Sequence, residues 1–404
     1  MYYLFKFSSR KMFSHIDQTK IRMAILLTFF TLTGMSIDLF APSLPGISAS
    51  LHIDPSTSKM VISIYLIGYA LGNFIIGIVT DAIGRKLPLR ISCTLFVIVS
   101  FLPPLIPNVY VLLIVRFLQG FLIGSMGVLS RGIFSDMFPP EKLLKLGPTL
   151  GLLWGLGPII GPIIGGFLQE YFGWESGFYF FGILTLIITI LVFIYIPETI
   201  AQKSKLQVSQ VRSNIMEILG NKEFISICIA MGTGYSMIIS FNTLGPFLVQ
   251  GVMGYSPAYF GKLAIFLGCS FLPAPIIGRK LLDHYSIGRI FLMMTHFFIL
   301  LIILFFILSF FIQDSIILLI VATMTVYFVC GSIFPISMGK GISMFRHISG
   351  TASAIMYLIT MTISGLVAFT QGHLHAHTIT DIISIYLVLM FVIVGLYWYK
   401  IKEL

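Results

Sequence analysis

Two residues of opposite charge, Asp38 and Arg116, lie inside long apolar runs of the sequence. A carboxylate in such a run can bind and release a proton or pair with a cation, and a guanidinium can be its partner. Each charge alone in hydrocarbon costs about 2.5–3.5 kcal/mol on insertion scales. The favoured interpretation is a proton or substrate site inside a membrane, and a purely structural ion pair is the alternative.

The composition indicates a membrane protein. The chain has 404 residues, with 25 Lys or Arg and 15 Asp or Glu, so that 10% are charged, against roughly 25% in an average soluble domain. Hydrophobic residues make up 57%, and the mean hydropathy is +1.00. These values exclude a soluble enzyme, a nucleic-acid-binding protein and a disordered chain, and they predict an all-α polytopic membrane protein.

Twelve apolar segments approach the roughly 20 residues that a membrane span requires. They cover residues 24–45, 60–80, 88–107, 109–130, 146–168, 176–197, 224–250, 260–278, 289–311, 316–337, 350–370 and 381–400. The longest polar stretch between them predicts a first six-helix bundle (1–198), a cytoplasmic linker (199–223) and a second six-helix bundle (224–404). Asp38 and Arg116 each lie about seven residues from the outer end of a segment, roughly 10 Å deep, so we expect them to face each other across a polar cavity.

The basic residues predict the orientation. Twenty-two of the 25 lie in the tails or in loops on the same side as the tails, and only Lys59 and Lys262 lie on the opposite side. Lys and Arg accumulate in the cytoplasmic loops of membrane proteins. We therefore expect a multi-pass protein of a bacterial-type cytoplasmic (inner) membrane with both termini in the cytoplasm. The net charge of +10 is then explained without a nucleic-acid partner.

Two loops half a chain apart share a pattern of glycine, acid and base. The loop after the second segment contains Gly77, Asp81, Gly84, Arg85 and Lys86, and a related pattern follows the eighth segment at an offset of 202 to 204 residues. The halves are therefore predicted to be repeats of one another. We expect the acid to accept at a neighbouring helix N-terminus and the bases to hold the loop at the cytoplasmic face, as a conformational latch between rocking bundles.

The first of these loops resembles the signature loop of the major facilitator superfamily. Three further motifs narrow the resemblance to the Bcr/CflA drug:proton antiporters. They are Ser36-Ile-Asp38-Leu-Phe-Ala-Pro42-Ser-Leu-Pro45, the RxxQG-like Arg116-Phe-Leu-Gln119-Gly120, and Gly157-Pro-Ile-Ile-Gly161-Pro162-Ile-Ile-Gly165-Gly166, which is similar to the antiporter motif GxxxGPxxGG. Glycine at every fourth position presents a flat face for close helix approach, which is typical of a tightly sealed contact.

The resemblance implies the major facilitator fold and a proton-coupled antiporter that exports small lipophilic or cationic compounds by alternating access. Asp38 and Arg116 are then the expected proton-coupling residues. The expected substrate cavity combines polar groups of both halves, namely Asp38, Tyr65, Tyr69, Asn73, Gln119, Tyr235, Asn242 and Tyr357. The expected partners are a small-molecule substrate, protons and the lipid bilayer. The chain is expected to be a monomer driven by a proton gradient, with no cofactor, metal site or catalytic residue.

A dedicated siderophore or metabolite carrier of the same superfamily, exporter or importer, is the first alternative. An intramembrane enzyme is disfavoured, because the sequence has no HExxH motif, no second membrane carboxylate for an aspartyl dyad and no Ser elbow with an intramembrane His partner. The sequence has no P-loop either, so ATP is not the expected driver. His373, His375 and His377 alternate in the last outer loop. A solvated loop is favoured there over a metal site.

Overall fold

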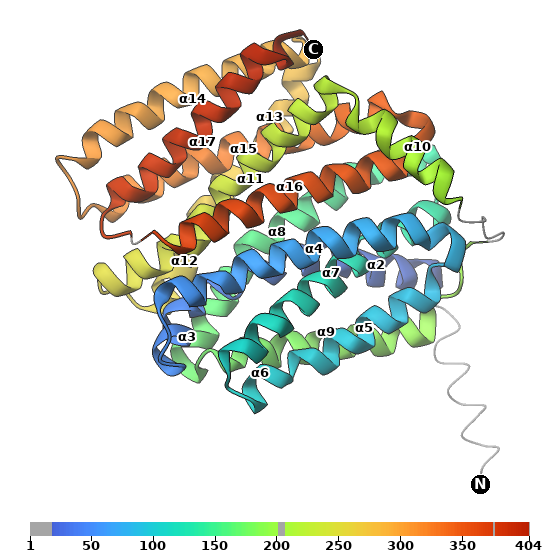
Figure 1. Cartoon of the computed structure of the whole chain (residues 1–404), viewed down its shortest axis with the longest axis horizontal. Helices are drawn as coiled ribbons and strands as arrows, with labels where there is room; N and C mark the ends of the chain where they lie inside the picture. Colours follow the sequence, from blue (N-terminus) through green and yellow to red (C-terminus); the bar gives the residue numbers. More distant parts are fainter. Residues whose placement is uncertain (1–17, 201–206, 375, 404) are drawn as a thin grey trace.

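The computed structural model describes residues 18–200, 207–374 and 376–403, and those residues form helices and connecting loops without any strand (Figure 1). Within the helix Pro140–Phe172, side chains are described for Leu143 and from Leu153 onward. The predicted all-α fold is confirmed.

The helices of the first half precede residue 200, and those of the second half follow residue 207. The first half contains α2 (Gln18–Asp38), α3 (Leu44–Ser50), α4 (Pro55–Ile83), α5 (Lys86–Ser100), α6 (Leu102–Leu105), α7 (Val109–Met137), α8 (Pro140–Phe172) and α9 (Glu175–Tyr195). The second half contains α10 (Val208–Leu219), α11 (Lys222–Pro246), α12 (Pro257–Phe271), α13 (Pro273–Leu282), α14 (Ile287–Ser309), α15 (Ile316–Met344), α16 (Ser349–Gly372) and α17 (Ile379–Tyr399).

Among the described residues, eleven helical stretches are long and apolar enough to cross a membrane. The fifth predicted segment corresponds to α8, which has 33 residues. Figure 1 shows α14 and α17 at one edge and α5 and α9 at the other, with α4 and α16 in contact between the halves. We call the side on which α2 begins and α17 ends the inner side. The amphipathic helix α10 lies there, within the predicted linker.

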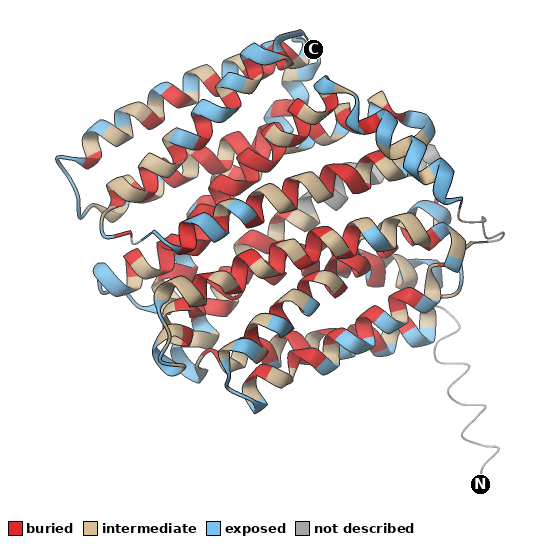
Figure 2. Ribbon diagram, in the orientation of Figure 1, coloured by how far each residue is buried: buried red, intermediate tan, exposed pale blue. Residues whose placement is uncertain are grey.

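Burial follows the position of each helix in the bundle (Figure 2). Buried residues concentrate on the central helices, and α11 has most of its length buried. The edge helices expose large apolar side chains, which include Ile98, Ile190, Leu300 and Val388. An apolar surface of this kind is suited to contact with lipid, because the bilayer core offers no hydrogen-bond partners.

Prolines interrupt two spans at corresponding positions of the halves. Helix α2 ends at Asp38, and a 3-10 turn over Ala41–Ser43 leads into α3. Helix α11 ends at Pro246 and continues as a π-helical turn over Phe247–Val252. Proline has no backbone N–H and cannot continue a regular helix beyond its first turn. The first predicted span is therefore a broken helix, and its only carboxylate stands at the break.

Candidate functional site

Asp38 lies in the interface between the two halves and is 1% exposed. Its Oδ1 atom accepts a hydrogen bond from the side-chain amide of Asn242 in α11. Its Oδ2 atom is buried and has no hydrogen-bond partner among the described residues. A buried polar oxygen without a partner is unfavourable, so this carboxyl group has an unused capacity to hold a proton or to bind a ligand.

Asp38 and Asn242 occupy equivalent places in the two halves. They are 204 residues apart, which is the offset between the Gly-Arg pairs of the repeated loops. The same offset relates Ser36 to Ser240 and Pro42 to Pro246. Each half thus carries Ser, then Asp or Asn two residues later, then Pro four residues after that. This repeated spacing is the sequence signal that could have predicted the contact, and the repeat of the loops alone does not reveal it.

Arg116 is fully buried in α7 and is surrounded by neutral partners. Its Nε atom donates to the Val61 carbonyl oxygen at 3.3 Å, and its Nη1 atom donates to Gln119 Oε1 at 3.1 Å. The rings of Phe40 and Tyr65 lie 4.4 Å and 4.2 Å from its guanidinium carbon. Cation–π contacts of this kind stabilise a desolvated guanidinium.

The expected direct pairing of Asp38 with Arg116 is wrong for this structure. No ion pair found among the described residues includes either side chain. The two are connected indirectly instead. Arg116 contacts Phe40 and Tyr65, and the Tyr65 hydroxyl donates to Ser36 Oγ. Arg116 is therefore linked to the chain on both sides of Asp38. The links run through Phe40, two residues after Asp38, and through Tyr65 to Ser36, two residues before it.

The other predicted cavity residues are also buried, so in the described part of the chain they do not line the open polar cavity that we expected. Gln119 donates to Ser100 Oγ at 2.9 Å, and Asn73 donates to the Gly124 carbonyl at 3.5 Å. Tyr69, Tyr235 and Tyr357 are 9% exposed or less. The polar groups gather in the predicted region, but they pack against one another.

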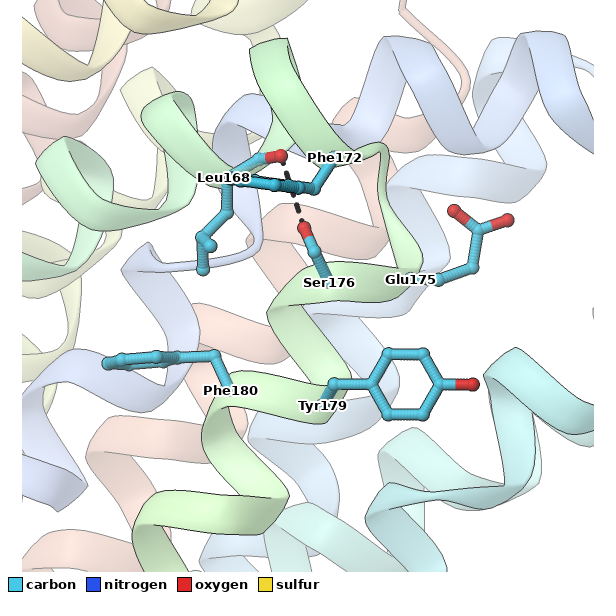
Figure 3. A pocket seen from close by; sticks show the side chains of 6 residues that line it. All are labelled: Leu168, Phe172, Glu175, Ser176, Tyr179 and Phe180. Atoms are coloured by element: carbon cyan, nitrogen blue, oxygen red, sulfur yellow. Dashed lines mark hydrogen bonds between the residues drawn. The ribbon is translucent and has the colours of Figure 1, made fainter.

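A shallow surface pocket lies elsewhere, at the outer ends of α8 and α9 (Figure 3). It is lined by Leu168, Phe172, Glu175, Ser176, Tyr179 and Phe180. The Ser176 hydroxyl donates to the Leu168 carbonyl oxygen at 3.1 Å. None of the predicted site residues lines this pocket.

Contacts between the halves close the outer side of Asp38. Lys59 in α4 is 2% exposed and donates to the Leu374 carbonyl oxygen at 2.6 Å. Gln250 donates to the Pro42 carbonyl oxygen at 3.0 Å, and the Ala258 amide donates to a Glu170 carboxylate oxygen at 2.8 Å. Hydropathy predicts Lys59 in an outer loop, so its burial in the interface is a correction.

A basic residue that hydropathy predicts in an inner loop lies in α7. Arg131 is partly buried, and its guanidinium carbon lies 4.5 Å from the centre of the Tyr357 ring in α16 of the second half. Its Nη2 atom is buried without a hydrogen-bond partner among the described residues. The predicted segment ends at residue 130, whereas the helix extends to Met137. Arg131 is therefore a contact between the halves on the inner side.

The glycine-rich motif brings α8 against α2. A Cβ atom on Gly157 would lie 2.3 Å from the Gly34 carbonyl carbon, and one on Gly165 would lie 1.9 Å from the Leu39 carbonyl oxygen. A Cβ atom on Gly161 would lie 3.1 Å from Leu39 N. The opposite face of the motif meets the second half, because a Cβ atom on Gly166 would lie 2.4 Å from the Pro257 carbonyl oxygen. The motif thus forms a close backbone contact beside Asp38.

The loop predicted as a latch joins three parts of the first half. Gly84 ends α4 with φ +97°, a conformation that favours glycine. Arg85 donates from Nε to Asp136 at 2.6 Å and from Nη2 to Asp81 at 3.0 Å. Gly77 faces α16, because its Cβ position would be 3.5 Å from Ala354 Cβ.

The acid at the start of α5 is Glu198, which corrects the expectation for Asp81. Four backbone N–H groups donate to Glu198, from Arg85, Lys86, Thr199 and Ile200. Carboxylates at a helix N-terminus accept hydrogen bonds from the free backbone amides and interact favourably with the helix dipole. Asp136 and Glu198 bond to the residues of the predicted latch, and both were absent from the predicted set.

Replacement of Glu198 by glutamine is expected to destabilise the fold slightly at neutral pH. Burial raises the pKa of Glu198, but the four amide donors outweigh burial, so the pKa is lowered overall. A lowered pKa contributes stability above the normal pKa of the carboxyl, and that stability is lost as the pH falls through the lowered value. We expect the thermal unfolding temperature to fall by about 1–3 °C at pH 7.

The difference in unfolding temperature between the wild type and Glu198→Gln is expected to shrink as the pH falls below the ordinary pKa of a glutamate. Thermal unfolding in detergent at several pH values measures it. Asp314→Asn is the control, because Asp314 lies exposed in an outer loop. A pH-independent difference would contradict the assignment.

Asp381, beside the predicted histidine loop, is engaged in a helix cap. Its Oδ2 atom accepts from the backbone amides of His377 and Thr378 and from the Thr378 hydroxyl. His375 lies outside the described residues. No metal-binding group of three or more acids, cysteines and histidines is found among the described residues.

Comparison with known proteins supports one family over most of the chain. The sequence profile of the Major Facilitator Superfamily matches residues 25–369. A multidrug resistance protein, MdtL of Vibrio parahaemolyticus, is 25% identical over 363 residues, which are 87% of this chain and 88% of that protein. A bicyclomycin resistance protein homolog of Haemophilus influenzae is 26% identical over 251 residues, 61% of this chain and 63% of that protein.

Solved structures give the same result for the fold. The crystal structure of a D-xylose–proton symporter superposes with a TM-score of 0.74 at 15% sequence identity. The superposition covers 94% of this chain and 97% of the symporter. At this identity the similarity establishes the shared fold, and it agrees with the predicted arrangement of two six-helix bundles.

Proposed function

Because the chain belongs to the Major Facilitator Superfamily, we propose that this transporter is a proton-coupled antiporter that exports small lipophilic or cationic compounds. We further propose that it acts as a monomer in the bacterial inner membrane with both termini in the cytoplasm. The 22 basic residues on the side of the tails support this orientation.

The observation that carries the proposal is the isolated carboxyl group of Asp38 between the halves. One oxygen accepts from Asn242 of the second half, and the other oxygen has no partner among the described residues. An ionised carboxylate removed from water needs compensating partners. We propose that Asp38 is protonated in the closed arrangement, and that opening to water on either side allows the proton to leave.

Competition between a proton and a substrate for Asp38 would couple their movements. A cationic or hydrogen-bonding substrate can occupy the place of the proton, so that each excludes the other. Arg116 supports this cycle as a positioning residue, because it contacts Phe40, two residues after the carboxylate, and Tyr65, which bonds to Ser36 two residues before it. Discrete rearrangements of packed elements, rather than gradual deformation, would then accompany proton binding.

Contacts on both sides of Asp38 support alternating access. Lys59 and Gln250 bond across the halves on the outer side, and Arg131 contacts Tyr357 across the halves on the inner side. Rocking of one bundle against the other would break one set and keep the other. The proton gradient is the proposed energy source.

The proposal is tested with the full chain reconstituted into proteoliposomes under an imposed pH gradient. The probes are a panel of organic cations, neutral drugs and siderophores. We expect at least one cation or neutral drug to be transported against its own concentration gradient. This transport is expected to stop when an ionophore collapses the pH difference. Movement that is indifferent to the ionophore would overturn proton coupling. Movement of siderophores alone would favour the dedicated carrier.

A further inference from the structure

Three aromatic rings meet between the halves at a place that proton coupling does not explain. Trp154 of α8 stacks on Phe334 of α15, with ring centres 5.5 Å apart and planes inclined by 14°. Tyr235 of α11 lies 5.9 Å from Trp154 and 6.1 Å from Phe334. We call these three residues the ring cluster.

The ring cluster covers the inner side of Asp38. A Cβ atom on Gly161 would lie 3.2 Å from Asp38 Cβ, and Trp154 precedes Gly161 by seven residues. Tyr235 precedes Asn242 by the same number. Seven helical residues correspond to about 10 Å, so both halves independently place the rings about 10 Å inward of the carboxylate.

The ring cluster joins the two halves. The Trp154 carbonyl oxygen lies 2.3 Å from where a Cβ atom on Gly34 would be, so the backbone of Trp154 moves with α2 and the first half. Phe334 and Tyr235 belong to the second half. Any opening of the inner side must therefore separate the indole from the two other rings.

Separation leaves two broad aromatic faces without their partner. An aromatic ring gains most from an offset-stacked or edge-to-face neighbour, and a flat ring of a substrate can restore that contact. We propose that Trp154 and Phe334 form a subsite for a planar aromatic ring when the inner side is open, and that they are specificity-determining residues. This inference rests on the proposed function, and it defines a substrate with a flat ring system at one end and a polar group at the other.

The test compares two probes of equal charge on the full chain in detergent, by calorimetric titration. Ethidium is a planar aromatic cation, and tetrabutylammonium is a cation without a ring. Trp154→Leu and Phe334→Leu are expected to weaken ethidium binding by about threefold to tenfold, with less than about twofold change for tetrabutylammonium. Trp154→Phe and Phe334→Tyr are expected to recover most of the affinity for ethidium.

Phe328→Leu is the matched control, because Phe328 lies on the same helix but packs against Phe298 within the second half. It is expected to leave both affinities unchanged. Equal losses of affinity for ethidium and tetrabutylammonium in the leucine variants, or no loss of affinity for either probe, would overturn the subsite. Failure of the wild type to bind ethidium would overturn it as well.

The readout separates this inference from the proposed function. Binding in detergent needs no pH gradient, so a wild type that binds ethidium selectively through the rings but never transports it would contradict only the antiport. A wild type that exchanges protons for substrates but binds both probes without regard to Trp154 and Phe334 would contradict only the subsite.

Discussion

Replacement of Asp38 by asparagine is expected to reduce gradient-driven transport to the level of empty vesicles. Asparagine has the same shape, and its amide oxygen can accept the hydrogen bond from Asn242. It cannot bind or release a proton in the physiological range. The substitution therefore removes the proposed coupling chemistry and preserves the contact between the halves.

Proteoliposomes with an imposed pH gradient measure the loss. Downhill exchange of substrate without a gradient is expected to continue, because the halves still rock. Asp54→Asn is the control, since Asp54 is an exposed acid directly before α4, and its side chain makes no capping hydrogen bond. Full gradient-driven transport by the Asp38→Asn protein would show that the proton is carried elsewhere.

Replacement of Gly157 by alanine is expected to lower the stability more than the Glu198→Gln substitution does. Its added methyl group would lie 2.3 Å from the Gly34 carbonyl carbon and 2.4 Å from Met35 N. Both neighbours are backbone atoms, which cannot rotate away. Overpacking of a close interior contact costs about 1–3 kcal/mol and occasionally more, and here α2 must move away from α8 next to Asp38.

Thermal unfolding in detergent, together with the yield of folded protein, measures this effect. Gly234→Ala is the matched control, because Gly234 is also a buried helical glycine, and no described atom beyond its own stretch of helix lies within 4 Å of its Cβ position. We expect the control to retain the wild-type unfolding temperature or to exceed it slightly, since alanine favours a helix. Equal unfolding temperatures for the two variants would contradict the role of the glycine face.

Hydropathy and charge were sufficient to predict the fold and the burial of Asp38 and Arg116. Apolar length predicts helices that span the membrane, and a lone carboxylate in such a helix must be buried between helices. Lys59 and Arg131 were misplaced because the helices extend beyond the apolar segments, and the interface between the halves buries residues that hydropathy assigns to loops.

The partners of the buried charges were not predictable from depth. Depth along the membrane says nothing about which face of a helix a side chain occupies. Arg116 contacts a backbone carbonyl, a side-chain amide and two aromatic rings, and it does not contact Asp38. Glu198 reaches the start of α5 only because the chain returns there after α9. Contacts of this kind depend on the packing of distant segments.

The equivalence of Asp38 and Asn242 has a consequence for the number of protons at the centre of the molecule. Residues at equivalent places near the axis between two repeats meet their own counterparts. Had both repeats kept the acid, two carboxyl groups would share one proton, as like charges in contact must. The amide of Asn242 instead donates a hydrogen bond and never titrates. The repeat provides the position twice, and because the second half carries an amide there, the centre holds a single titrating group with a fixed donor beside it.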